Sequence, residues 1–205
     1  KYDIKKELKR FFGYDEFRTF RTDMWEEISQ EEVIKQTLAW KNILTVFATW
    51  WGKSLTFQLP ALINADKMNC LSLVISPLQS LMKDQIDNLN KKDIQNVGFL
   101  NGLLSPLERK EVIDKVEYWG IDILYLSPEM LRSENTKHIL SWRVIDRIII
   151  DEAHCFSKWW HDFRIDYMFI ADFIKELWEV NPSMKNINIS CFTATAKHEV
   201  VEEIK

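Results

Sequence analysis

Short aliphatic runs recur along the chain and alternate with segments in which apolar residues return every three or four positions. Six runs have the length of strands and contain few polar residues, as in strands buried on both faces of a sheet. They cover residues 43–47, 71–75, 97–100, 121–126, 144–150 and 187–192. The segments 78–89 and 169–177, which lie between runs, have helical spacing. This alternation predicts an α/β fold with a mostly parallel sheet and helices on both faces.

Two further helices are predicted ahead of the sheet, at residues 4–12 and 24–38. The chain contains no internal repeat, low-complexity segment or Gly/Ser linker. Its 205 residues are enough for one domain with a substantial core. We therefore expect a single domain over residues 1–205, with a helical lead-in at 1–39 and the α/β core at 40–205.

Composition is that of a soluble globular protein, with 46% hydrophobic and 28% charged residues. No stretch approaches the roughly 18 uninterrupted apolar residues of a membrane span, and the polar start does not resemble a signal peptide. We therefore expect a cytosolic protein without a membrane partner. Three cysteines lie far apart and are expected to be reduced. The net charge of −4 predicts no strongly basic surface, although backbone N–H groups and helix N-termini can still hold phosphates.

The aliphatic run at 148–150 ends abruptly in Asp151-Glu152-Ala153-His154. A buried strand that stops there places both acids at the carboxyl edge of a sheet, where open α/β folds bind ligands. The first carboxylate can hold Mg²⁺, and the second can take a proton from an attacking water. The alternative is an ordinary strand end followed by a helix N-terminus, which also favours acids.

A second polar segment follows the run at 43–47 and precedes an apolar helix, which is the layout of a phosphate-binding loop. It reads Thr49, Trp50, Trp51, Gly52, Lys53 and Ser54. The chemistry of such a loop needs converging backbone N–H groups, a lysine near the β/γ oxygens and a hydroxyl on Mg²⁺. Phe47 stands where the standard pattern has its first glycine, so an ordinary helix start is the alternative.

Several further segments follow in a definite order. They are Ser76-Pro77-Leu78-Gln79 after the second run, Ser127-Pro128-Glu129 after the fourth, residues 155–164 after the acids, and Thr193-Ala194-Thr195 after the last run. With these segments, and with Phe12-Gly13-Tyr14 near the start, the whole chain resembles the first RecA-like lobe of a RecQ-family superfamily 2 DNA helicase. The resemblance implies a RecA-like P-loop domain that uses ATP and Mg²⁺.

For the nucleotide, the resemblance implies that Lys53 and Ser54 contact the β/γ-phosphates and Mg²⁺. It implies that Asp151 holds Mg²⁺ and that Glu152 orients or deprotonates the hydrolytic water. Gln30 lies at about the family's distance upstream for the glutamine that contacts adenine. The usual lead-in before that glutamine is absent, so a solvated helix position is the alternative for Gln30.

For DNA, residues 155–164 match the family's aromatic-rich loop, which in relatives couples single-stranded DNA binding to ATP hydrolysis. The resemblance implies that DNA is contacted by Trp159, His161, Phe163 and Arg164. Aromatic faces can stack on bases and the guanidinium can contact phosphate. The alternative is that the aromatics belong to the core.

The segments that begin with Ser76-Pro77 and Ser127-Pro128 are also implied to contact the DNA backbone through N–H groups at helix starts. As caps with proline in the first turn they need no function. His154, Thr193 and Thr195 are implied to couple the nucleotide site to DNA-dependent movement, while a structural hydrogen bond is the alternative for His154.

The chain departs from the family in one repeated way, because Trp40, Trp50, Trp51 and Trp160 stand where relatives have glycine. Where glycine has a positive φ, another L-residue costs about 1–2 kcal/mol. Two functions therefore stay open. The first is the motor lobe of an ATP-dependent 3′-to-5′ DNA helicase that works with a second RecA-like lobe. The second is a helicase-like nucleic-acid-binding or scaffold module that has lost nucleotide binding.

The first function predicts that the chain alone is inactive, because relatives supply an arginine to the γ-phosphate from the second lobe. It also predicts a location with DNA, in the cytoplasm at a bacterial nucleoid or in a nucleus. A third possibility, a small-molecule kinase, leaves the aromatic segment and both Ser-Pro segments unexplained.

Overall fold

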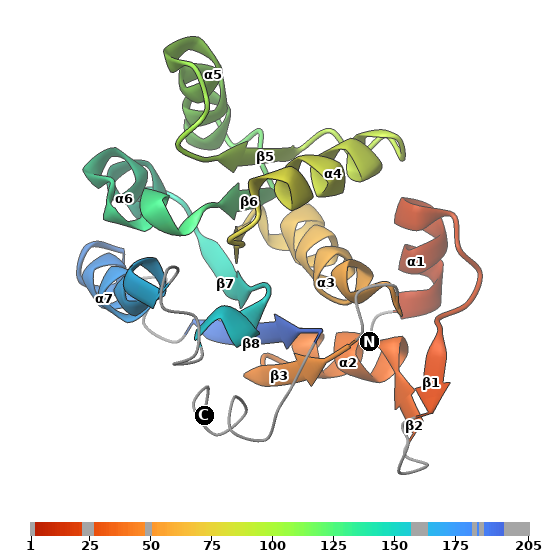
Figure 1. The fold of residues 1–205 in the computed structure, drawn as a ribbon. Helices are drawn as coiled ribbons and strands as arrows, with labels where there is room; N and C mark the ends of the chain where they lie inside the picture. Colours follow the sequence, from red (N-terminus) through yellow and green to blue (C-terminus); the bar gives the residue numbers. More distant parts are fainter. Residues whose placement is uncertain are drawn as a thin grey trace.

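Six parallel strands form the centre of the molecule in a computed structural model that describes residues 3–21, 27–47, 51–156, 164–181, 184 and 187–194 (Figure 1). Their order in the sheet is β3-β8-β7-β4-β6-β5. The last strand in the sequence, β8, therefore lies between β3 and β7 and pairs in parallel with both. This arrangement brings the loop after β3 and the acids after β7 to the same edge of the sheet.

The elements have the following bounds. The strands are β1 Thr19–Arg21, β2 Glu27–Ser29, β3 Ile43–Val46, β4 Leu71–Ile75, β5 Val97–Leu100, β6 Ile123–Leu126, β7 Ile145–Ile150 and β8 Asn188–Thr193. The α-helices are α1 Ile4–Phe12, α2 Gln30–Leu38, α3 Lys53–Met68, α4 Gln79–Asn90, α5 Pro106–Glu117, α6 Glu134–Ser141 and α7 Arg164–Val180. Short 3₁₀ turns follow β6 at Pro128–Arg132 and β7 at Ala153–Phe156.

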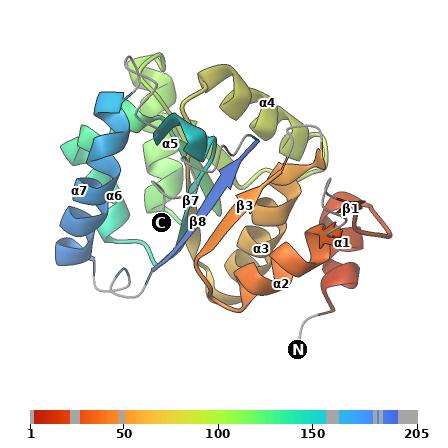
Figure 2. The same ribbon diagram turned by 60° about the horizontal axis from the view of Figure 1, so that its bottom comes forward.

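Helices cover both faces of the sheet, and the sheet separates the core into two layers (Figure 2). Residues of α1 to α4 pack on one face, and residues of α5, α6 and α7 pack on the other. Side chains along β7 alternate between the layers: Ile148 and Ile150 face α7, whereas Ile149 faces α3. Because both faces are covered, the central strands β4, β6 and β7 are buried at every position, which explains their largely aliphatic sequence. The charged residues of β7, Asp146 and Arg147, are buried with it and lie against each other. No helix of the described segments is both long and apolar enough to cross a membrane.

The predicted α/β fold and parallel sheet are confirmed, and each of the six runs contains a strand within about two residues of the predicted bounds. The helix predicted at 24–38 is wrong in its first part. Residues 27–29 instead form β2, which pairs antiparallel with β1. The helix begins only at Gln30, because Ser29 is extended and its side chain accepts a hydrogen bond from the Glu31 N–H.

Two of the helices end in a tryptophan with left-handed backbone. After α2, Trp40 has φ 58°, and after α5, Trp119 has φ 62°. In both cases two successive N–H groups close the helix end: Trp40 donates to Thr37 O and Lys41 to Gln36 O, and the turn at Trp119 repeats this pattern. This is the Schellman motif, whose left-handed residue is usually glycine.

Candidate active site

The carboxyl end of β7 and the first turn of α3 bring one lysine between two acids. Lys53 Nζ lies 2.8 Å from Asp151 Oδ1 and 2.5 Å from Glu152 Oε1. Asp151 is the first residue after β7, and its N–H donates to Ile75 O at the end of the neighbouring strand β4. Glu152 adopts a left-handed φ of 52°, and its N–H donates to Asp151 Oδ1. The three residues predicted to be catalytic therefore lie together.

This cluster is almost completely buried, because Lys53, Asp151 and Glu152 are only 4%, 1% and 6% exposed. Burial disfavours the charged amine, but attraction to Asp151 and hydrogen bonds to both acids outweigh burial and raise the pKa of Lys53. The ammonium is thus held in place before any ligand arrives. A polyanion that entered the site would compete with the two carboxylates for this cation.

His154 links the acids to the end of β8. Its Nδ1 lies 3.0 Å from Thr193 Oγ1 and 3.3 Å from Glu152 Oε2. Thr193 is the last residue of β8 and is completely buried. Two of the three residues predicted to couple the sites are therefore in contact with each other, and one of them reaches Glu152. Thr195 lies outside the described residues.

The loop before α3 is tied to the N-terminal segment through Gln30. Gln30 Nε2 donates to the carbonyl oxygens of Trp51 (3.0 Å) and Gly52 (3.3 Å), and Gln30 Oε1 accepts from Arg18 N–H. Because Gln30 is only 2% exposed, its alternative interpretation as a solvated helix position is wrong. Gly52 has φ 75°, and a Cβ there would lie 2.8 Å from Gln30 Nε2. This position therefore favours glycine for its dihedral angles, and an added Cβ would in addition displace the Gln30 amide.

Trp51 is the first described residue of the loop before α3, because Thr49 and Trp50 lie outside the described residues. The Trp51 ring is only partly buried and is tilted against Phe47, with ring centroids 6.4 Å apart. Phe47, which takes the place of the family's first loop glycine, is fully buried, and its N–H donates to Thr193 O. The start of the loop is therefore anchored to β8.

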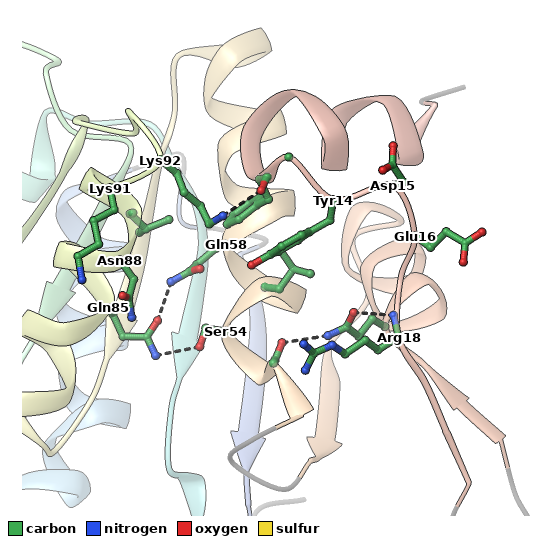
Figure 3. A pocket seen from close by; sticks show the side chains of 16 residues that line it. Tyr14, Asp15, Glu16, Arg18, Ser54, Gln58, Gln85, Asn88, Lys91 and Lys92 are labelled. Atoms are coloured by element: carbon green, nitrogen blue, oxygen red, sulfur yellow. Dashed lines mark hydrogen bonds between the residues drawn. The ribbon is translucent and has the colours of Figure 1, made fainter.

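A pocket of about 820 Å³ opens beside the first turn of α3 (Figure 3). Its lining includes Gln30, Gly52 and Ser54, which the sequence had singled out. It also includes two residues that were not assigned to the site, namely Tyr14 and Arg18. Tyr14 follows α1, is half exposed, and has the Lys92 ammonium 4.5 Å from its ring centroid.

Aromatic, cationic, amide and acidic side chains thus line a pocket that continues toward the head of α3. The sequence signals that could have found Tyr14 and Arg18 were Phe12-Gly13-Tyr14 and Phe17-Arg18, two short motifs far from the phosphate loop. Their place in the site depends on how the chain between Arg18 and Gln30 folds back, through the β1–β2 hairpin.

The donor set fits Mg²⁺ bound together with a phosphate ligand. Asp151 offers a carboxylate and Ser54 a hydroxyl, and Mg²⁺ is commonly held by one or two protein oxygens with the remaining positions on phosphates and water. Among the described residues there is no cluster of three or more His, Cys, Asp or Glu side chains that could hold a metal alone. Such a site would depend on the phosphates for metal binding.

The Ser-Pro segments lie at the same sheet edge, after β4 and β6, but differ from one another. Ser127 is the N-cap of the 3₁₀ turn with Pro128 in its first position, as predicted. The prediction for Ser76 and Pro77 is wrong in its local structure, because α4 begins two residues after Pro77, at Gln79, with Leu78 as its N-cap. Both serine hydroxyls are buried and have no hydrogen-bond partner among the described residues, so we expect any DNA contact here to use the backbone.

The aromatic segment after the acids falls outside the described residues, which include none of Trp159, His161 or Phe163. Arg164 is the first residue of α7, and only its backbone is described. The predicted DNA contacts of these four residues therefore stay predictions.

The DEAD/DEAH box helicase family model matches residues 27–204. The chain belongs to this family. Among curated proteins it is 38% identical over 197 residues to the ATP-dependent DNA helicase RecQ of Pasteurella multocida, covering 96% of this chain and 28% of that protein. It is 36% identical over 181 residues to the ATP-dependent helicase SGS1 of Saccharomyces cerevisiae, covering 86% of this chain and 12% of that protein. The resemblance to RecQ helicases is thereby confirmed.

Solved structures agree on the fold. The DUF1998 helicase MrfA superimposes with a TM-score of 0.70 at 22% identity, covering 98% of this chain and 30% of that one. The DEAD-box helicase Mss116, solved with ssRNA and UDP-BeF, superimposes with a TM-score of 0.65 at 19% identity, covering 85% and 36%. The chain is thus a RecA-like helicase domain that spans 28% of the length of its RecQ relative from Pasteurella.

Proposed function

We propose that the chain is the first motor lobe of a RecQ-type, ATP-dependent 3′-to-5′ DNA helicase and binds ATP–Mg and single-stranded DNA. The observation that carries this proposal is the buried contact of Lys53 with Asp151 and Glu152 beside the pocket. A lysine at the head of a helix and two acids at the end of a strand are the groups that phosphoryl transfer to water requires.

The chemistry follows from these positions. Triphosphate binding draws the Lys53 ammonium from the carboxylates to the β/γ oxygens, and the loop N–H groups and the first turn of α3 add further donors. Mg²⁺ held by Ser54 and Asp151 would neutralise charge that develops on the phosphates. Glu152, released from Lys53, is then able to accept a proton from the attacking water.

The base end of the nucleotide is assigned to the pocket wall formed by Tyr14, Arg18 and Gln30. Tyr14 offers an aromatic face, and Arg18 a planar cation, to a purine ring. Gln30 joins this wall to the loop through its bonds to Trp51 and Gly52. The proposed role of Gln30 is therefore twofold, to contact adenine and to set the position of the phosphate loop.

DNA binding is assigned to the Ser76-Pro77 and Ser127 segments and to the loop that carries Trp159, His161, Phe163 and Arg164. The contact of His154 with Thr193 and Glu152 provides the coupling between this edge and the water-activating acid. We expect the protein to act where DNA is found, at a bacterial nucleoid or in a nucleus.

The 205-residue chain alone is proposed to have negligible ATPase and no unwinding activity. In helicases of this class a second RecA-like lobe closes over the nucleotide and supplies an arginine to the γ-phosphate, and such arginines are worth roughly 10³–10⁵ in rate. Robust DNA-stimulated turnover by this chain alone would refute this part of the proposal.

Calorimetric titration with a non-hydrolysable ATP analogue and Mg²⁺ tests nucleotide binding. Lys53→Arg keeps a cation beside the buried acids but changes its geometry, so we expect binding to weaken about tenfold or more. Lys110→Arg, at an exposed surface pair with Asp114, is the matched control and should bind normally. If the chain does not bind the nucleotide and a Trp50→Gly/Trp51→Gly variant does, the result supports the scaffold function and contradicts the motor function for the unaltered chain.

A further inference from the structure

The hydroxyl of Ser54 is held by a relay of side chains that reaches across the core. Gln85 Nε2 on α4 donates to Ser54 Oγ at 2.8 Å (Figure 3). Gln58 Nε2 on α3 donates both to Gln85 Oε1 at 2.7 Å and to the Tyr125 hydroxyl oxygen on β6 at 2.9 Å. Side chains from α3, α4 and β6 are therefore joined by a series of hydrogen bonds that ends at Ser54, at the head of α3.

The direction of these bonds determines which hydrogen-bonding groups of the Ser54 hydroxyl are already used. Gln58 directs its amide nitrogen at two oxygens, and in this network the Gln85 amide oxygen faces Gln58 while its nitrogen faces Ser54. Ser54 Oγ is consequently an acceptor toward α4. A hydroxyl has one proton and two lone pairs, so the proton and the second lone pair remain for the ligand side.

The ends of the relay lie next to the two Ser-Pro segments. Tyr125 is buried, stands two residues before Ser127, and is the strand residue through which Gln58 is held. Gln85 belongs to the helix that follows Ser76, Pro77 and Leu78. A shift of α4 or of the end of β6 would change the position of the Gln85 amide and, through it, the orientation of the Ser54 hydroxyl.

We infer that Gln85 is a positioning residue that orients the Ser54 hydroxyl toward the bound nucleotide and its metal ion. Through Gln85, this orientation depends on the position of α4. The inference rests on the proposed function. Gln85 acts through Ser54 and not by contact with the reacting atoms. Its loss should therefore reduce the part of nucleotide affinity that depends on Mg²⁺, and should leave metal-free binding unchanged.

Gln85→Met tests this assignment, because methionine has a similar length and no donor or charge. Affinity for the non-hydrolysable ATP analogue is measured by calorimetry with Mg²⁺ and again with EDTA. One lost hydrogen bond to the serine should lower the ratio of the two affinities about tenfold. Gln95→Ala, at an exposed glutamine, is the matched control and should leave the ratio unchanged.

A double-mutant cycle with Ser54→Ala shows whether Gln85 acts through the serine. In the Ser54→Ala background, Gln85→Met should have no further effect on the ratio, since interacting residues are not additive. An equal effect in both backgrounds, or a Gln85→Met protein with the wild-type ratio, overturns the assignment. If the wild-type chain binds no nucleotide, the proposed function itself fails and the assignment falls with it.

A different observation concerns the two Schellman motifs, in which tryptophan occupies the left-handed position. Trp40 and Trp119 are both nearly half exposed, and the Arg143 guanidinium lies 4.5 Å from the ring centroid of Trp119. Other left-handed positions outside the active site carry residues that tolerate this conformation, such as Asn69 at φ 50° and Asp93 at φ 60°. The chain has nine tryptophans and only five glycines, and a bulky aromatic is among the residues least suited to this position.

We infer that positions 40 and 119 are encoded by UGA codons that the source cell reads as glycine. UGA is a stop codon in the standard genetic code, and variant codes assign it to tryptophan or to glycine. If a gene in which UGA means glycine is translated with a code in which UGA means tryptophan, the resulting sequence has tryptophan where the backbone requires glycine. The same codon at position 51 would give two consecutive glycines before Lys53.

The codons of the gene, together with peptide mass spectrometry of the protein from its own cell, test this inference. The expected result is UGA at codons 40 and 119 and glycine in the corresponding peptides. A UGG codon at either position, or a tryptophan-containing peptide from the native protein, overturns it.

Discussion

Replacing Lys53 with methionine should destabilise the free protein, because it leaves Asp151 and Glu152 buried side by side without a cation. The ammonium lies 2.8 Å and 2.5 Å from the two acids, and all three side chains are less than 10% exposed. Removing one partner of a buried ion pair typically costs about 3–5 kcal/mol. We expect a loss of this size in the free energy of unfolding at neutral pH.

The penalty should shrink as the pH falls. In the variant, burial and the neighbouring carboxylate of Glu152 both raise the pKa of Asp151, and Lys53 no longer opposes them. The folded variant therefore takes up a proton more readily than its unfolded chain does, and its stability relative to wild type rises as the pH drops through that raised pKa.

Urea denaturation of wild type and Lys53→Met, followed by circular dichroism at pH 7.5 and pH 5, measures both effects. Lys110→Met serves as the control, because Lys110 is exposed and an exposed ion pair such as its contact with Asp114 contributes little to stability. A Lys53→Met protein as stable as wild type at pH 7.5 would show that the ion pair does not form in solution. An equal loss at both pH values would exclude carboxylate charge as the cause.

Three further outcomes follow from local geometry. Gly52→Ala should lower the free energy of unfolding by about 1–2 kcal/mol and weaken nucleotide binding, since φ is 75° and the new Cβ meets Gln30 Nε2; denaturation and calorimetry measure the two effects. Burial raises the pKa of the Cys70 thiol to about 12 and that of Cys191 to about 11, so both should resist alkylation in the folded state at pH 8 and react on unfolding, as mass spectrometry would show. Trp40→Gly should stabilise the chain by about 1 kcal/mol, whereas glycine for Trp178 within α7 should destabilise it by a similar amount, a sign difference that thermal denaturation detects.

The sheet and the acid–lysine cluster were predictable because each depends on local sequence. Continuous aliphatic runs mark strands buried on both faces, and a run that stops at Asp151 places that residue at the strand end whatever lies around it. Lys53 follows the same logic at the head of a helix. Only one long-range assumption, that parallel strands expose their carboxyl ends on one edge, was needed to bring them together.

The rest of the site depends on contacts between distant segments that no local pattern records. Gln30 is buried through contacts with Arg18, Trp51 and Gly52, and strand β2 of the β1–β2 hairpin just before it falls within the helix predicted at 24–38. Gln85 lies between the apolar positions of the helical pattern at 78–89, and that pattern does not record its hydrogen bond to Ser54. Ser76-Pro77 resembled a helix start, yet α4 begins only after Leu78 takes the capping position.

Because β8 lies between β3 and β7, it also determines when the sheet can be completed during synthesis. The strand that leads into the phosphate loop has β8 as its only partner in the described sheet, and β8 is the last of the strands described in this sheet to leave the ribosome. A nascent chain that has not yet made residue 188 leaves β3 unpaired and the aliphatic edge of β7 open. Strands so far apart in sequence pair slowly, so a newly made chain passes through an interval in which this edge needs protection from aggregation.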